Sequence, residues 1–166
     1  MFNNPAFQLF LMATVEPYNL NWPAGVDRML LVSVGTGTAP KANPQLRSED
    51  MNLIYDVSSI PVALIYAAGN QQDFLGRTFG DCLAGPLLDI EVGDMYSVGG
   101  PATPKLFTYV RYNCELTRQG LDELGLLEIQ PENVQMLDSV EHVGELQQIG
   151  KALAERQVKE SHFARF

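Results

Sequence analysis

The feature that most constrains the fold is the largely apolar run Met29–Val34, which Gly35 and Gly37 follow closely. The run is too short for a helix and shows no alternation of polar and apolar side chains. It therefore predicts a strand covered on both faces, as in a parallel α/β sheet, and we expect it to be a central strand. The glycines predict a structural turn at Gly35, Thr36 and Gly37, at the end of the strand where open α/β sheets usually bind ligands.

The length and composition predict one globular domain. The chain has 166 residues, 46% hydrophobic and 19% charged, which is enough for one core and too few to suggest two domains. The longest apolar run, Ile60–Ala68, contains a proline and falls well short of the ~20 residues that cross a bilayer. The first residues, Met1–Asn4, lack the basic segment and apolar core of a secretion signal. We expect no transmembrane segment and a cytoplasmic location.

The charge and the cysteines exclude several classes of partner. With 20 acidic and 11 basic residues the net charge is -9, which repels phosphate backbones, so we expect no nucleic acid partner. Cys82 and Cys114 are too few for a disulfide framework or a clustered metal site, and they predict buried free thiols. His142 and His162 lack the spacing of metal ligands, and we interpret them as solvent-facing. The sequence predicts no metal and no cofactor.

Helices are expected before and after the predicted strand in the sequence. Asn4-Pro5 is typical of a helix start, and it predicts a helix over Ala6–Val15 that is apolar nearly all round and buried on most sides. Two helices are expected between residues 51 and 79, because a proline at position 61 interrupts the pattern. The second of these runs from near Ser59 to about Phe79. Gly80–Pro104 is expected to be irregular, with at most short strands.

The second half of the chain predicts a strand and two helices. The alternation of apolar and polar residues over Val110–Leu116 predicts a half-exposed strand at an edge of the sheet. Thr117 is expected to cap a short helix that Gly125 ends. Asp138 and Glu141 have the spacing of a capping box, which predicts a last helix from Ser139 to about Lys159.

The sequence contains no complete catalytic motif. The pattern nearest to Gly-x-Ser-x-Gly is Met95–Gly99, which has Met at the first position, so we interpret Ser97 as a chance match. Ser33 is expected to be a core hydroxyl bonded to the backbone. The turn Gly35–Thr38 lacks the Lys of a phosphate loop and the third glycine of a dinucleotide fingerprint, which leaves nucleotide binding as a third and weaker alternative.

Two short motifs together are similar to a known family. Asn3-Asn4-Pro5-Ala6 and, further along, Leu30–Gly37 resemble the C-terminal half of patatin-like phospholipases. In that family a D-G-[GA] motif with the catalytic Asp precedes an N-N-P-A helix start, and an LLVSLGTG-like strand follows. Members are lipid acyl hydrolases with a Ser-Asp dyad, the Ser lying on a G-x-S-x-G turn. The resemblance implies part of a three-layer α/β/α fold with a mostly parallel sheet, and a lipid or phospholipid substrate in the full-length protein.

The resemblance also implies that catalysis needs residues outside these 166. Neither the Ser motif nor the Asp motif is present, so we expect residues 1–166 to be the C-terminal portion of a single domain that is inactive alone. Asn3, Asn4 and Pro5 would lie next to the missing Asp, and no catalytic or substrate-binding residue is assigned. The apolar helix Ala6–Val15 could then mediate self-association. The alternative is a stand-alone, non-catalytic module that binds a lipid or a protein.

Overall fold

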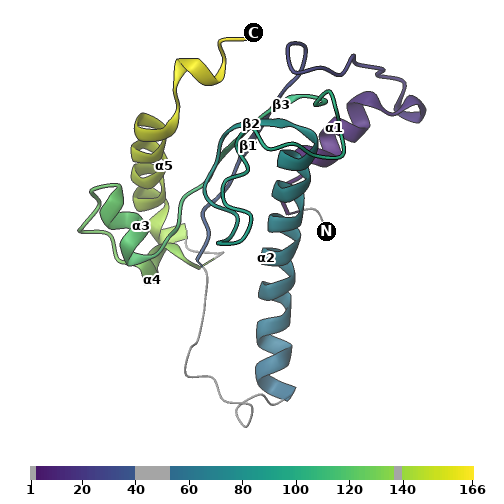
Figure 1. Cartoon of the computed structure of the whole chain (residues 1–166). Helices are drawn as coiled ribbons and strands as arrows, with labels where there is room; N and C mark the ends of the chain where they lie inside the picture. Colours follow the sequence, from purple (N-terminus) through teal and green to yellow (C-terminus); the bar gives the residue numbers. More distant parts are fainter. Residues whose placement is uncertain (1–2, 40–52, 137–139) are drawn as a thin grey trace.

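The protein has an α/β fold, in which helices surround a small parallel sheet (Figure 1). The computed structural model describes residues 3–39, 53–136 and 140–166. Its three strands are β1 (Leu30–Val34), β2 (Asp81–Ala84) and β3 (Thr108–Tyr112), in the order β1-β3-β2 with both pairs parallel. The helices are α1 (Ala6–Thr14), α2 (Leu53–Phe79), α3 (Arg118–Glu123), α4 (Pro131–Val134) and α5 (Val143–Gln157). The predicted fold class is confirmed.

The central strand is β3, and the prediction of a half-exposed edge strand there is wrong. Leu30 lies opposite Thr108 and Val34 opposite Tyr112 on one side, and β2 pairs with the other side. All five residues of β3 are buried, including Arg111. The polar side chain that suggested an exposed face is instead held by polar partners inside the protein.

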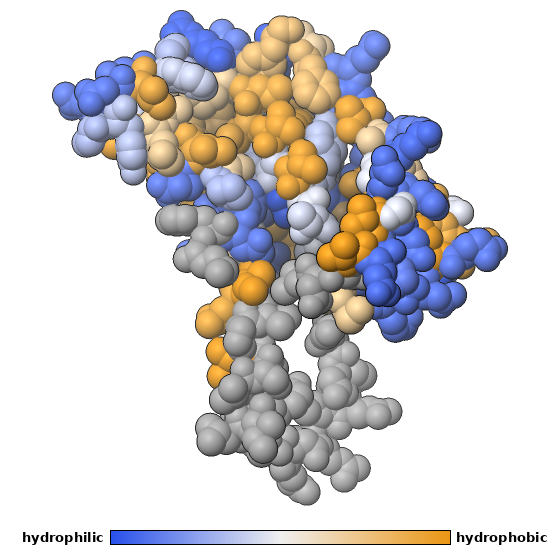
Figure 2. All heavy atoms as spheres, turned by 180° about the vertical axis from the view of Figure 1, so that it is seen from behind, coloured by the Kyte–Doolittle hydropathy of each residue, from blue (hydrophilic) through white to orange (hydrophobic). Residues whose placement is uncertain are grey.

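The strand β1 lies at an edge, and the prediction of a central strand covered on both faces is wrong for the described residues. Leu31 and Ser33 are buried, whereas Val32 and Val34 are 43% and 73% exposed. The helices α1 and α2 cover the face that carries Leu31. On the opposite face α5 packs against β3, and Val32 and Val34 of β1 stay exposed there. Viewed from behind, the upper half of the molecule carries a broad apolar area (Figure 2).

The helix α1 confirms the predicted segment but not its burial on most sides. Ala6, Phe10 and Ala13 pack against the sheet, where the Phe10 and Phe107 rings lie 4.6 Å apart. Leu9, on the outer side, is 57% exposed. One stripe of the helix is therefore buried, as in an ordinary surface helix.

The helix α2 is continuous, and the prediction of two helices is wrong. It spans 27 residues and passes through position 61, although it ends at Phe79 as expected. Proline removes one backbone hydrogen bond from a helix. The remaining hydrogen bonds of so long a helix outweigh that loss.

The short helix after β3 begins and ends as predicted. The Thr117 hydroxyl accepts a hydrogen bond from the Gly120 N–H at 3.2 Å, and Gly125 ends the short helix with a φ of +76°. The proposed capping box begins in a segment, 137–139, that lies outside the described residues. After it, the short turn Val140–His142 precedes α5, which starts at Val143, later than predicted, and ends at Gln157, close to the predicted end. Within the described ranges, no helix has the length and apolarity needed to span a bilayer.

Candidate functional site

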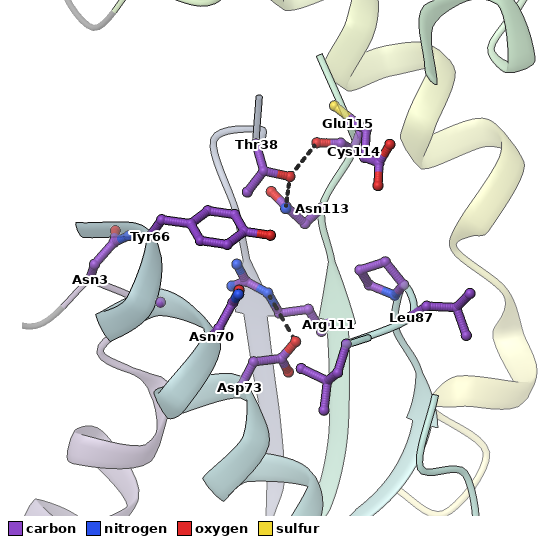
Figure 3. Close-up of a pocket in the computed structure, with 13 residues that line it drawn as sticks. Asn3, Thr38, Tyr66, Asn70, Asp73, Leu87, Arg111, Asn113, Cys114 and Glu115 are labelled. Atoms are coloured by element: carbon purple, nitrogen blue, oxygen red, sulfur yellow. Dashed lines mark hydrogen bonds and ion pairs between the residues drawn. The ribbon is translucent and has the colours of Figure 1, made fainter. Parts of the chain in front are cut away.

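The candidate site is a small polar pocket at the carboxyl ends of β1 and β3 (Figure 3). Its volume is about 120 Å³, and α2 forms one wall while the residues after β3 form another. The lining residues are Asn3, Thr38, Tyr66, Gly69, Asn70, Asp73, Pro86, Leu87, Leu88, Arg111, Asn113, Cys114 and Glu115. This is the edge of a parallel sheet at which α/β proteins usually bind ligands.

A buried ion cluster forms the floor of the pocket. Asp73 and Arg77 lie one turn apart on α2, and the Arg77 side chain donates to both carboxylate oxygens, at 3.1 and 2.8 Å. The Tyr109 hydroxyl donates to the same carboxylate at 2.9 Å. Arg111 lies farther away, with its Nε 3.9 Å from Asp73. The cluster joins α2 to the central strand through charged groups that water hardly reaches.

The pKa values in this cluster show which protonation states are stable. Burial and the neighbouring Asp73 raise the pKa of the Tyr109 hydroxyl, so this group keeps its proton and donates it. Burial alone would lower the pKa of Arg77, but the hydrogen bonds and charge of Asp73 outweigh it and raise the value. Burial raises the pKa of the nearby Cys82 thiol to about 11, which makes it an unreactive neutral group.

A chain of hydrogen bonds runs from Arg111 to the start of α1. Arg111 donates to the Ser33 hydroxyl at 2.6 Å, and Ser33 donates to the Asn4 side-chain oxygen at 2.7 Å. Asn4 has a φ of +66°, a conformation that asparagine tolerates better than most residues. The Ser33 hydroxyl is buried as predicted, but its partners are side chains and not the backbone.

The turn after β1 is built around Asn113. The Gly37 N–H donates to the Asn113 side-chain oxygen at 3.0 Å, and the Asn113 amide nitrogen donates to the Thr38 hydroxyl at 3.3 Å. Gly37 has a φ of +97°, which favours glycine. Gly35 is required for a different reason, because a Cβ there would lie 2.0 Å from the Asn113 oxygen.

The structure brings most of the predicted site residues to this edge of the sheet. Asn3 lines the pocket, and its amide donates to the Ile65 carbonyl at 2.8 Å. The Pro5 carbonyl accepts the first backbone hydrogen bond of α1, from Leu9 at 2.9 Å. Thr36 is exposed between the two glycines and does not line the pocket.

Two residues considered at the sequence level lie elsewhere. Ser97 is in the exposed loop between β2 and β3, far along the chain from any strand-to-helix turn. His162 is half-buried and only in part solvent-facing, and its Nδ1 lies 2.8 Å from the Tyr112 hydroxyl. Burial and the charge of Lys159 lower the pKa of His162, which favours its neutral form.

Sequence reasoning missed the charged residues of the site. Asp73 and Arg77 look like an ordinary exposed pair at helical spacing, and Arg111 looks like the polar side of an amphipathic strand. The available signal was Arg111 itself, since it stands between Val110 and Tyr112 in an apolar strand.

The chemistry available at this pocket is charge pairing and hydrogen bonding. In residues 3–39, 53–136 and 140–166, no group of three or more His, Cys, Asp or Glu residues is placed to hold a metal ion. No family model, curated protein or solved structure matches the chain. The fold and the site define an α/β protein with a polar pocket at the carboxyl edge of its sheet.

Proposed function

We propose that this chain is the C-terminal part of a patatin-like lipid acyl hydrolase. In this proposal residues 1–166 supply part of the sheet and a polar frame for the active site. In the family the catalytic Asp precedes the Asn-Asn-Pro-Ala motif, and in the full-length protein that Asp would lie near the carboxyl edge of the sheet. Hydrolysis of the lipid ester would need that Asp and the elbow Ser, neither of which belongs to residues 1–166.

One contact carries most of the support for this proposal. The two motifs that resemble the family are far apart in sequence, yet Asn4 of the first accepts a hydrogen bond from Ser33 of the second at 2.7 Å. Arg111 fixes that contact from the central strand. Asn3, the neighbour of Asn4, lines the pocket at this edge of the sheet.

The exposed face of β1 favours the second candidate, a non-catalytic binding module. Val32 and Val34 are apolar and accessible on a strand that has one described neighbour. Exposed apolar surface of this kind commonly marks a site of protein or lipid interaction. Under the hydrolase proposal, the same surface would pack against the remainder of the enzyme.

Two observations separate the candidates. The first is the coding DNA upstream of Met1, and the second is an esterase assay of two proteins: residues 1–166 alone, and the longer protein expressed from the extended reading frame. An in-frame D-G-[GA] codon motif shortly before Met1 supports the hydrolase, and a stop codon there supports the module. Residues 1–166 alone should hydrolyse a short-chain nitrophenyl ester no faster than buffer, whereas the longer protein should hydrolyse it readily.

Ser97→Ala is the matched control for this assay. If residues 1–166 hydrolysed the ester and the Ser97→Ala variant did not, Ser97 would be a nucleophile and the proposal would be wrong. The longer protein should lose no activity with this substitution, because Ser97 lies in an exposed loop.

A further inference from the structure

The buried charges beneath the pocket do not balance. Asp73 is the single carboxylate of the described cluster, and it faces two guanidinium groups, Arg77 and Arg111. Arg77 takes up both oxygens of Asp73 at short range, while Arg111 stays 3.9 Å away. Glu115 also lines the pocket, but it is exposed at its rim, and Tyr109 is neutral. One positive charge is therefore left over, at Arg111.

Arg111 also has hydrogen-bonding capacity to spare. A guanidinium group carries five N–H donors. Among the described residues, Arg111 donates one hydrogen bond, to the Ser33 hydroxyl, and makes the longer contact with Asp73. An uncompensated charge with unused donors is costly to bury. Arg111 is nevertheless only 9% exposed.

The unused donors of Arg111 border the pocket and not the protein core. Figure 3 shows its guanidinium among the side chains of Tyr66, Asn70 and Asp73. The pocket volume of about 120 Å³ is several times the ~30 Å³ that one water molecule occupies in the liquid. A group as large as a carboxylate or a phosphate therefore has room beside Arg111.

We propose that this pocket binds a small oxyanion, a carboxylate or a phosphate, through the guanidinium of Arg111. The planar fork of arginine matches two oxygens of either anion, and Asn70, which lines the same pocket, can supply a further donor through its side-chain amide. The bound anion compensates the excess charge of the cluster. The whole chain carries a net charge of -9, which repels anions elsewhere. An excess positive charge at the pocket therefore distinguishes it from the rest of the molecule.

The test measures thermal unfolding of residues 1–166 with sodium phosphate, sodium acetate or sodium chloride at matched ionic strength. Phosphate or acetate should raise the unfolding midpoint by at least about 5 °C once its concentration is about a hundred times Kd. Chloride should not. A rise with phosphate alone assigns the site to a phosphate or a phosphorylated headgroup, and a rise with acetate alone assigns it to a carboxylate.

Arg111→Gln should abolish the rise, and Lys151→Gln, which removes an exposed cation on α5, should leave it unchanged. If Arg111→Gln does not fold, Arg111→Lys keeps the charge without the fork and should weaken binding about tenfold by calorimetry. The proposal is overturned if neither anion exceeds chloride, or if both Arg111 variants bind as tightly as the unsubstituted chain. The readout involves no hydrolysis, so its failure would leave the proposed function standing.

Discussion

At Gly35 the backbone passes so close to Asn113 that there is no room for a side chain. A Cβ at this position would lie 2.0 Å from the Asn113 oxygen and 2.6 Å from its amide carbon. The same oxygen holds the Gly37 N–H, so Asn113 cannot move away without releasing the turn. The glycine thus fixes the distance between the turn and the end of β3.

Replacing Gly35 by Ala should destabilise the protein by about 1–3 kcal/mol, the usual cost of overpacking. The measurement is the free energy of unfolding in urea. Gly150→Ala in α5 is the matched control, because a Cβ there meets no atom within 4 Å. Alanine at that position should be neutral or stabilising by up to about 1 kcal/mol. Equal stabilities of the two variants would contradict the packing argument.

The sequence predicts the backbone of the site better than its charges. Turn chemistry predicts the turn at the two glycines, and the family resemblance singles out Asn3-Asn4-Pro5. Both signals can be read from short local stretches of sequence. Whether Arg111 is buried depends on Asp73 and Ser33, which come from other elements of the fold. No local pattern could have brought these three residues together.

At the scale of the element, the run Met29–Val34 predicts a strand correctly but not its place in the sheet. An apolar run indicates that both faces are suited to burial, and it does not identify what covers them. Conversely, the alternation in β3 predicts an exposed face, because an arginine between two apolar residues is typical of a solvent-facing position. Both errors arise because the neighbours of a strand are set by tertiary structure.

The exposed side of β1 should make residues 1–166 associate with one another. Val34→Lys should lower the association constant about tenfold in sedimentation equilibrium, because charge on an edge strand opposes strand pairing. Leu9→Lys tests the earlier expectation that association occurs through Ala6–Val15. Its effect should be smaller, since α1 already satisfies its backbone hydrogen bonds. A monomeric unsubstituted chain would contradict both expectations.

At the scale of the whole molecule, the two ends of the chain hold opposite faces of one small sheet. The helix α1 packs on the face that carries Leu31 and Tyr109. Near the other end, the side chain of Arg165 donates to Asp81 at 2.7 Å and to Thr108 at 3.1 Å. The sheet is thus most firmly held at β3 and least at the outer side of β1.

The position of β1 at an edge has a consequence for the exchange of amide protons with heavy water. The Gly35 N–H donates to the Tyr112 carbonyl, and the register therefore turns the N–H groups of Leu31, Ser33 and Gly35 toward β3. Those of Leu30, Val32 and Val34 point away from it. Exchange measured by NMR should accordingly alternate between slow and fast along β1, whereas uniform protection would contradict this edge position. If a further strand paired with this edge of β1, only the fast-exchanging amides of Leu30, Val32 and Val34 would become slow. That change would show that the added strand binds on the side of β1 away from β3.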